Sequence, residues 1–371
     1  MVEKSTQKQD TTPIGALPTH QWALQLHGPG LYSVDRVPLP TPAPGQVLVR
    51  IECAPINPSD TYFMSGMYKL YTDDPNKVKY PMAPGWEGAG VVVANGGGIM
   101  GWRLVGKRVA VTRCREENRM FSIGGCYQQY MITTAMQCLP LPDTMSLEQG
   151  SMHFVNPLSA LGLLDTAKTY KTKAIVQTAA ASQLGKMVVH LCKEEKIPLI
   201  NIVRRDEQVK MLSEIGAEYV LDSSQSGFGE RLKELADKLQ ATVLFEAVGG
   251  ETTAEVLEQL PYNSVCIIYG LLSEKPISNL DPLLLIGRNQ RLEGFFLGHY
   301  LTQKSIWGQL SLFKKCTQLM SSGLFKSDVA KRVSLFEIKD AIMEYKANMS
   351  KGKYIVYPQQ EPTPEDMSGQ Q

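Results

Sequence analysis

The chain has 371 residues, of which 43% are hydrophobic and 20% charged, and its formal net charge is +1. This length and composition predict a globular protein of two domains and exclude a chain that is disordered throughout. A net charge near zero gives no global attraction to nucleic acid or to an anionic membrane surface, and we expect neither as a partner.

The seven cysteines are scattered along the chain and include no C-x-x-C pair. This pattern indicates neither a disulfide framework nor a cysteine-rich zinc lobe, so we expect buried, reduced thiols. The N-terminal residues 1–20 lack the features of a secretory signal or a transit peptide, and no apolar run is long enough to span a bilayer. We therefore expect a cytoplasmic protein, with the mitochondrial matrix as the alternative.

The first 112 residues contain short β-rich runs separated by clusters of proline and glycine. These runs are residues 22–26, 46–51, 88–94 and 108–112. Short strands with such turns predict a partly open β-barrel or a β-sandwich.

After about Gly150 the pattern changes to strands that alternate with helices. The predicted strands are 174–180, 199–203, 219–221, 242–247 and 265–269, and the predicted helices between them are 182–195, 207–215, 230–239 and 252–260. This alternation predicts an α/β fold with a doubly wound parallel sheet. Helices at 305–321 and 336–347 follow, and we expect a last strand at 353–357 to return to the N-terminal domain.

The turn after the first of these strands reads Gln177-Thr-Ala-Ala-Ala-Ser-Gln-Leu-Gly185. Small residues at such a turn let backbone N–H groups and a helix N-terminus approach a pyrophosphate. Only Gly185 remains of the usual three glycines, and a turn of small residues is common in α/β folds. Its place at the start of the alternation nevertheless favours a dinucleotide site.

The second strand of the alternation ends at Val203 and is followed by Arg204 and Arg205. A carboxylate in this position would accept hydrogen bonds from the ribose of NAD. Arginine instead offers a planar fork for phosphate oxygens, so the sequence predicts NADPH as the cofactor. A solvated arginine pair at a strand end is the alternative interpretation.

With these segments in place, the chain resembles the zinc-free branch of the medium-chain dehydrogenase/reductase superfamily. This branch includes quinone oxidoreductases and mitochondrial-type 2-enoyl thioester reductases. The motifs that carry the resemblance span residues 22–358 and are Asn57-Pro-Ser-Asp60, Pro84-Gly-Trp-Glu-Gly88, Val155-Asn-Pro-Leu-Ser-Ala160, Phe245-Glu-Ala-Val-Gly-Gly250 and Gly352-Lys353.

The resemblance implies a GroES-like β-rich catalytic domain formed by residues 22–155 and 326–358. It implies a Rossmann NADPH-binding domain at 156–325, disordered segments at 1–21 and 359–371, and a homodimer. Zinc-dependent relatives have a cysteine ligand where Asn57 stands, so the resemblance implies no metal. The charged stretch 113–119 has no clear counterpart and is interpreted as a loop over the cleft.

The resemblance also implies site residues. Tyr68 matches the tyrosine that thioester reductases use as a proton donor, with Tyr62 and Tyr71 as weaker candidates, and Asn57 is expected to orient the nicotinamide or the substrate. Asp60 and Glu87 are expected to hold loops, and His153 is expected to be structural. The expected cofactor-binding residues are Asn57, Ser159, Ala181, Ser182, Gln183, Leu184, Gly185, Arg204, Arg205, Val248, Tyr269, Gly270, Phe295, Phe296 and Lys353.

Three functions stay open from the sequence. The first is NADPH-dependent reduction of an activated C=C in an enoyl thioester or enone, with Tyr68 as proton donor. The second is reduction of a quinone by NADPH. The third is an inactive relative retained as a structural or binding protein, which the loss of glycines from the phosphate loop would suit.

Overall fold

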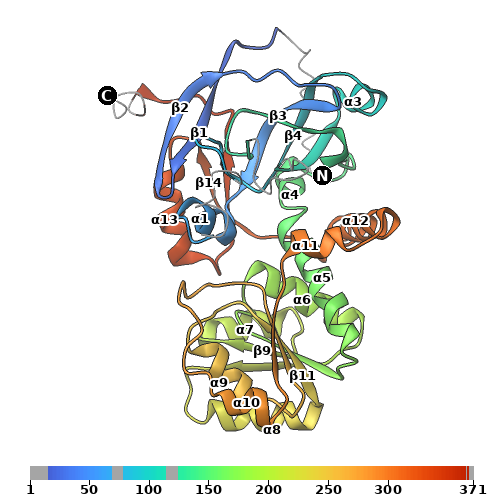
Figure 1. The fold of residues 1–371 in the computed structure, drawn as a ribbon, viewed down its shortest axis with the longest axis vertical. Coiled ribbons are helices and arrows are strands. Elements are labelled where there is room, and N and C mark those ends of the chain that lie inside the picture. The colour runs from blue at the N-terminus through green and yellow to red at the C-terminus, as the bar shows by residue number, and fades with distance from the viewer. Residues whose placement is uncertain (1–15, 69–77, 114–123, 365, 367–371) are drawn as a thin grey trace, which may run out of the picture.

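The structure, a computed structural model, describes residues 16–68, 78–113, 124–364 and 366. A β-rich part contains both ends of the described chain, and a part built on a parallel sheet contains its middle (Figure 1). Helices α5, α11 and α12 lie at the side where the two parts meet. No described helix is both long and apolar enough to cross a membrane.

The β-rich part consists of one large mixed sheet and a separate antiparallel hairpin. The hairpin is formed by β1 (His20–Gly28) and β2 (Leu31–Pro38). The large sheet has the order β14-β15-β3-β4-β5-β7, with β6 also paired to β3. Its strands are β3 (Gln46–Pro55), β4 (Glu87–Asn95), β5 (Arg108–Thr112), β6 (Tyr130–Thr134), β7 (Cys138–Pro140), β14 (Val329–Ser334) and β15 (Lys353–Tyr357).

The last strand joins the two ends of the β-rich part. Ile355 and Val356 of β15 pair antiparallel with Pro55 and Ala54 of β3. The expected return of the terminal strand is therefore confirmed. Short helices cover this part: α1 (Pro58–Met64), α3 (Ile99–Leu104), the 3₁₀ turn η1 (Ala135–Gln137), α4 (Leu147–Ser151) and α13 (Ile338–Asn348).

The second part is a six-stranded parallel sheet with the order β10-β9-β8-β11-β12-β13. The strands are β8 (Ala174–Gln177), β9 (Leu199–Val203), β10 (Tyr219–Asp222), β11 (Ala241–Glu246), β12 (Val265–Ile268) and β13 (Arg291–Gly294). Numbered within this sheet, the order is 3-2-1-4-5-6, which is the doubly wound order of dinucleotide-binding domains. Its switch point lies between β8 and β11, and ligands of such sheets bind at the carboxyl ends of the strands.

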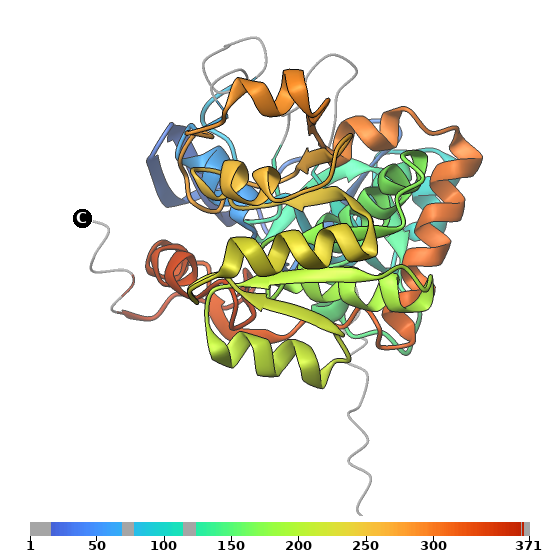
Figure 2. The ribbon, with the colours of Figure 1, turned by 90° about the horizontal axis from the view of Figure 1, so that it is seen from below.

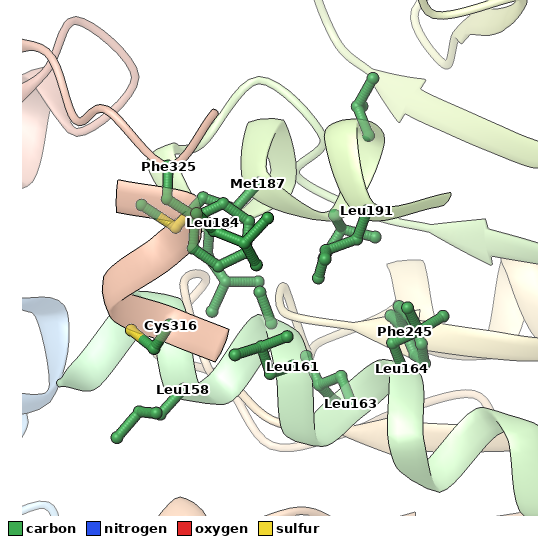
Figure 3. Close-up of a cluster of buried hydrophobic side chains, with 14 of the residues drawn as sticks. Leu158, Leu161, Leu163, Leu164, Leu184, Met187, Leu191, Phe245, Cys316 and Phe325 are labelled. Carbon is green, nitrogen blue, oxygen red and sulfur yellow. The ribbon is translucent and has the colours of Figure 1, made fainter. Parts of the chain in front are cut away.

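Helices cover both faces of this sheet (Figure 2). Successive residues of β8 point to opposite faces: Ile175 packs in the core with α5 (Val155–Thr169), α6 (Gln183–Glu194) and α12 (Ile306–Ser321), whereas Val176 packs with α8 (Phe228–Leu239) and α9 (Thr252–Glu258). Figure 3 shows the first of these cores, in which leucines of α5 face those of α6. The remaining helices are α7 (Asp206–Glu214), α10 (Pro282–Gly287) and α11 (Leu297–Thr302).

Several sequence expectations are wrong in detail. The first strand of the alternation ends at Gln177 rather than at residue 180, and the parallel sheet has a sixth strand, β13. Gln21, expected in a disordered segment, is buried, and its side chain bonds to Gln128 at 3.2 Å. Gln359, expected in the disordered tail, donates to the carbonyl oxygen of Ile51 at 2.8 Å.

Candidate active site

The β8–α6 turn forms a cradle of backbone N–H groups. Ser182 caps α6, and its Oγ accepts a hydrogen bond from the N–H of Gly185 at 3.0 Å. Among the described residues, no acceptor faces the backbone N–H of Ala181, Gln183 or Leu184, although these residues are only 2–9% exposed. Unpaired N–H groups at the start of a 12-residue helix favour a bound anion such as a pyrophosphate.

The same turn allows only small residues at its tightest point. A Cβ on Gly185 would lie 2.4 Å from the carbonyl oxygen of Ala180, so the one retained glycine is required for the turn to pack against the helix. Gln177, the last residue of β8, holds the turn in place. Its Nε2 donates to the carbonyl oxygen of Gly185 at 3.1 Å and to Asn201 Oδ1 at 2.7 Å. These contacts hold the loop against β9 and the start of α6.

The two arginines after β9 differ in their surroundings. Arg205 donates to Ser350 Oγ at 3.1 Å and lies 3.4 Å from Glu207. The exposed guanidinium of Arg204 has no partner in the part of the chain that the structure describes. Arg204 is thus the arginine whose donors stay available for a phosphate.

The other expected cofactor residues follow the carboxyl ends of neighbouring parallel strands. Val248 follows β11, Tyr269 and Gly270 follow β12, and Phe295 and Phe296 follow β13. Glu246 shapes the first of these loops, because its Oε1 accepts from the N–H groups of Val248 at 2.6 Å and Gly249 at 2.8 Å. Ser159 lies on α5 and is 8% exposed.

A buried polar network lies at the start of α1 in the β-rich part. Asn57 and Glu87 are 0% and 1% exposed, and Lys353 is 2% exposed. Asn57 Nδ2 donates to Glu87 Oε1 at 3.1 Å, and Lys353 Nζ donates to Asn57 Oδ1. The other oxygen of Glu87 accepts from the N–H groups of Phe154 at 2.8 Å and Val155 at 2.9 Å, where α5 begins.

This network fixes the orientation of the Asn57 amide. A flipped amide would place its NH₂ against the Lys353 ammonium and its oxygen against the Glu87 carboxylate, and both contacts are repulsive. Asp60 adds support, because its two oxygens accept from the backbone N–H groups of Asn57 at 2.9 Å and Trp86 at 2.8 Å. The loop-holding roles expected for Asp60 and Glu87 agree with these bonds.

Burial shifts the titration of every charged group in the network. It lowers the pKa of Lys353 to about 8, although Glu87 and Asp60 act in the opposite direction. It raises the pKa of Asp60 to about 7 and raises that of Glu87 above its usual value. Lys353, which the sequence analysis expects to bind cofactor, donates from its ammonium to Asn57, another expected cofactor residue.

Tyr68 lies beyond the end of α1 and is half-buried. Its ring packs edge-to-face on Tyr62, with 6.4 Å between the ring centroids. Burial raises the pKa of Tyr62 well above its usual value, and Glu274, in the loop after β12, adds to this effect. Tyr71 lies outside the described residues.

The comparisons with known proteins agree with this arrangement. Residues 43–143 match the family model described as an alcohol dehydrogenase GroES-like domain, and residues 184–314 match the one described as a zinc-binding dehydrogenase. A Mesorhizobium loti protein described as an NADPH:quinone reductase is 32% identical, with a TM-score of 0.79 over 92% of this chain and 100% of its own. The chain belongs to the medium-chain dehydrogenase/reductase superfamily.

Other proteins similar to this medium-chain dehydrogenase/reductase include an enoyl reductase and a quinone oxidoreductase. A mitochondrial enoyl-[acyl-carrier-protein] reductase of Dictyostelium discoideum is 27% identical over 76% of this chain and 77% of its own length. The Escherichia coli quinone oxidoreductase complexed with NADPH is 23% identical and shares the fold, with a TM-score of 0.76 over 91% of this chain and 100% of its own.

His153 and the described cysteines of this medium-chain dehydrogenase/reductase are buried. His153 is fully buried between Thr317 and Cys316, and burial lowers its pKa to about 4. The six described cysteines are free and buried, as expected. Within the described residues, no group of three or more His, Cys, Asp or Glu side chains could hold a metal ion.

The sequence did not predict contacts between the phosphate loop and the segment before β14. Gln183 and Lys186 of α6 both contact Asp328, 142 to 145 positions away. The one available signal was Gln183 itself, a long polar side chain in a loop where small residues are usual.

Proposed function

We propose that this chain is a zinc-independent NADPH-dependent oxidoreductase that reduces an activated C=C of an enoyl thioester or enone. The observation that carries the proposal is the phosphate loop, in which the backbone N–H groups of three largely buried residues lack an acceptor in the described chain. It opens beside the switch point of a 3-2-1-4-5-6 sheet, where dinucleotides bind.

The residues present fit the cofactor. The N–H groups of Ala181, Gln183 and Leu184 would hold the pyrophosphate, and Arg204 would pair with a 2′-phosphate. Val248, Tyr269, Gly270, Phe295, Phe296 and Ser159 would line the nicotinamide half. NADPH supplies the hydride when it is bound, and this chain positions the reactants and handles the proton.

Independence from zinc is supported by the hydrogen bonds that already occupy the side-chain oxygens of the Asn57 network. Asn57 Oδ1 accepts from Lys353, Glu87 Oε1 accepts from Asn57, and Glu87 Oε2 accepts from two backbone N–H groups. A metal ion at Asn57 would have to displace the ammonium of Lys353, which already donates to Asn57 Oδ1.

Tyr68 is proposed as the proton donor. Hydride addition to the β-carbon of an enoyl substrate leaves negative charge on the carbonyl oxygen and the α-carbon, and a phenol can supply the proton that the α-carbon takes up. Mitochondrial enoyl-[acyl-carrier-protein] reductases that are 26–28% identical to this chain support this substrate class. The edge-to-face contact of Tyr68 with Tyr62, at 6.4 Å between ring centroids, would hold the phenol in place.

Reduction of quinones is the second candidate. The 32% identity to the Mesorhizobium loti protein, described as an NADPH:quinone reductase, favours it.

Two measurements test the proposal. Fluorescence titration should show that NADPH binds, and NADPH oxidation should then be followed with enoyl thioesters, enones and quinones. Faster turnover of enoyl thioesters or enones supports the first candidate, and faster turnover of quinones replaces it with the second. A protein that binds no NADPH would instead be a structural relative.

A further inference from the structure

The chain crosses from the parallel-sheet part back to the β-rich part through residues 322–328, and both parts hold the end of this segment. On the β-rich side, Gln149 of α4 donates to the carbonyl oxygen of Ser327 at 3.1 Å and accepts from its N–H at 3.3 Å. On the other side, Gln183 Oε1 accepts from the N–H of Asp328 at 2.9 Å. Two glutamines, one from each part, thus hold adjacent residues.

Helix α6 makes two polar contacts with this segment, one from Gln183 and one from Lys186, and the contact from Gln183 involves the more buried residue. Gln183 is only 5% exposed, and its side chain both accepts from the N–H of Asp328 at 2.9 Å and donates to Asp328 Oδ2 at 3.4 Å. The ion pair between Lys186 and Asp328 is 2.5 Å long, but the Asp328 side chain is 58% exposed, and such pairs contribute little. Phe325, which is fully buried, packs against Leu184 and Met187 of the same helix (Figure 3).

From Asp328 the contacts continue to the Asn57 network. The carbonyl oxygen of Asp328 accepts from the N–H of Lys353 at 2.7 Å, and Lys353 Nζ donates to Asn57 Oδ1. Gly352 makes this approach possible, because a Cβ there would lie 2.9 Å from the same carbonyl oxygen. Hydrogen bonds therefore connect the phosphate loop to Asn57 through Gln183, Asp328 and Lys353.

We propose that Gln183 is a positioning residue that locks the phosphate loop to the returning segment and so fixes the loop relative to Asn57. This inference rests on the proposed function, because the loop and Asn57 are where that function places the cofactor and the reacting groups. In this proposal the backbone N–H of Gln183 binds the cofactor's phosphate, and its side chain bonds to Asp328 and so forms the lock. The long polar side chain of Gln183 at this turn is then a functional part of the loop.

The lock can be tested without any substrate. Gln183→Met keeps the length of the side chain and removes both hydrogen bonds to Asp328. Hydrogen–deuterium exchange should become at least about tenfold faster at the amides of Asp328 and Lys353, because a freed amide loses the protection of its closed state. Gln290→Met is the matched control: Gln290 is also buried and bonds to the carbonyl oxygens of Leu257 and Leu260, on the other side of the parallel sheet.

The effect on the reaction is measured with NADPH and substrate both saturating. We expect kcat of Gln183→Met to fall about tenfold, while Gln290→Met, with a comparable change in melting temperature, keeps the kcat of the parent. A second variant, Gln183→Gly, should also lose kcat, although it removes a large side chain from the loop.

Unchanged exchange at Asp328 and Lys353 in Gln183→Met would overturn the proposal. Tighter NADPH binding with undiminished kcat in Gln183→Gly would overturn it as well, since the side chain would then only obstruct the loop. A parent protein that binds no NADPH refutes the proposed function instead, and the exchange experiment still decides whether the lock exists.

Discussion

Lys353 and Asn57 are 296 positions apart in the chain, yet the ammonium of the first donates a hydrogen bond to the amide oxygen of the second inside the protein. Glu87 lies on the opposite side of the amide and balances the lysine's charge. The charge of Lys353 therefore strengthens the hydrogen bond that, together with Glu87, orients Asn57.

This charge predicts an alkaline limb in the pH–rate profile. Burial lowers the pKa of Lys353 to about 8, so its ammonium is present below that pH and is lost above it, and kcat/KM should fall as the pH rises through 8. The fall should not reflect unfolding. An unfolded lysine keeps its proton up to about pH 10.5, so loss of this proton between pH 8 and 10.5 favours the folded state.

Lys353→Met should remove this limb and lower kcat/KM roughly 10- to 100-fold, the value of one charge-assisted hydrogen bond. Because the single change leaves Glu87 buried without its counter-charge, the double variant Lys353→Met/Glu87→Gln should recover melting temperature without recovering activity. Lys331→Met, which removes an exposed lysine paired with Glu344, serves as the control. An unaltered alkaline limb in Lys353→Met would assign the titration to another group.

Cofactor preference should depend more on Arg204 than on Arg205, because Arg205 already contacts Ser350 and Glu207. Arg204→Ser should weaken NADPH binding roughly 10- to 100-fold and leave NADH binding nearly unchanged, whereas Arg205→Ser should have the smaller effect. Fluorescence titrations of both cofactors measure this. Equal affinity of the parent for NADPH and NADH would contradict the predicted 2′-phosphate site.

Proton donation is tested with the adjacent tyrosines. Tyr68→Phe keeps the ring that packs on Tyr62 but removes the hydroxyl, so NADPH should still bind while kcat for an enoyl thioester falls by about 10²–10⁴-fold. Quinone reduction should be far less affected, because water can supply its protons. Tyr62→Phe is the companion variant: a larger loss from Tyr62→Phe than from Tyr68→Phe would move the donor role to Tyr62.

Metal content is tested by elemental analysis of the purified protein. The oxygens of Asn57 and Glu87 are engaged by Lys353 and by N–H donors, so we expect no stoichiometric zinc and no loss of activity after dialysis against a chelator. About one tightly bound zinc per chain would refute the zinc-independent assignment.

The sequence predicted the parallel sheet well because its inner strands are short apolar runs buried on both faces. It missed β13, whose Arg-Leu-Glu-Gly sequence lies at the sheet edge, and β2, an exposed strand of polar and apolar residues. It also missed α5, which is buried around most of its circumference between Pro157 and Leu164 and so lacks an amphipathic period.

For the site, the motifs indicated Asn57, Glu87 and Lys353 one by one, but not that they bond to one another. Such bonds depend on how β15 pairs with β3 and on the side-chain rotamers, and neither leaves a local pattern in the sequence. The lock at Gln183 was missed for the same reason, since its partner Asp328 lies 145 positions away.

The place of β15 in the chain has a consequence for the order of folding during synthesis. All six strands of the parallel sheet have been synthesised by residue 294, and α12 and Phe325, which complete its core, by residue 325, so this part can fold while the ribosome is still adding the rest. The β-rich sheet must wait for residues 353–357, and until they arrive the carboxylate of Glu87 has no ammonium neighbour. A nascent chain would therefore acquire a binding surface for the dinucleotide well before it acquires a competent reaction centre.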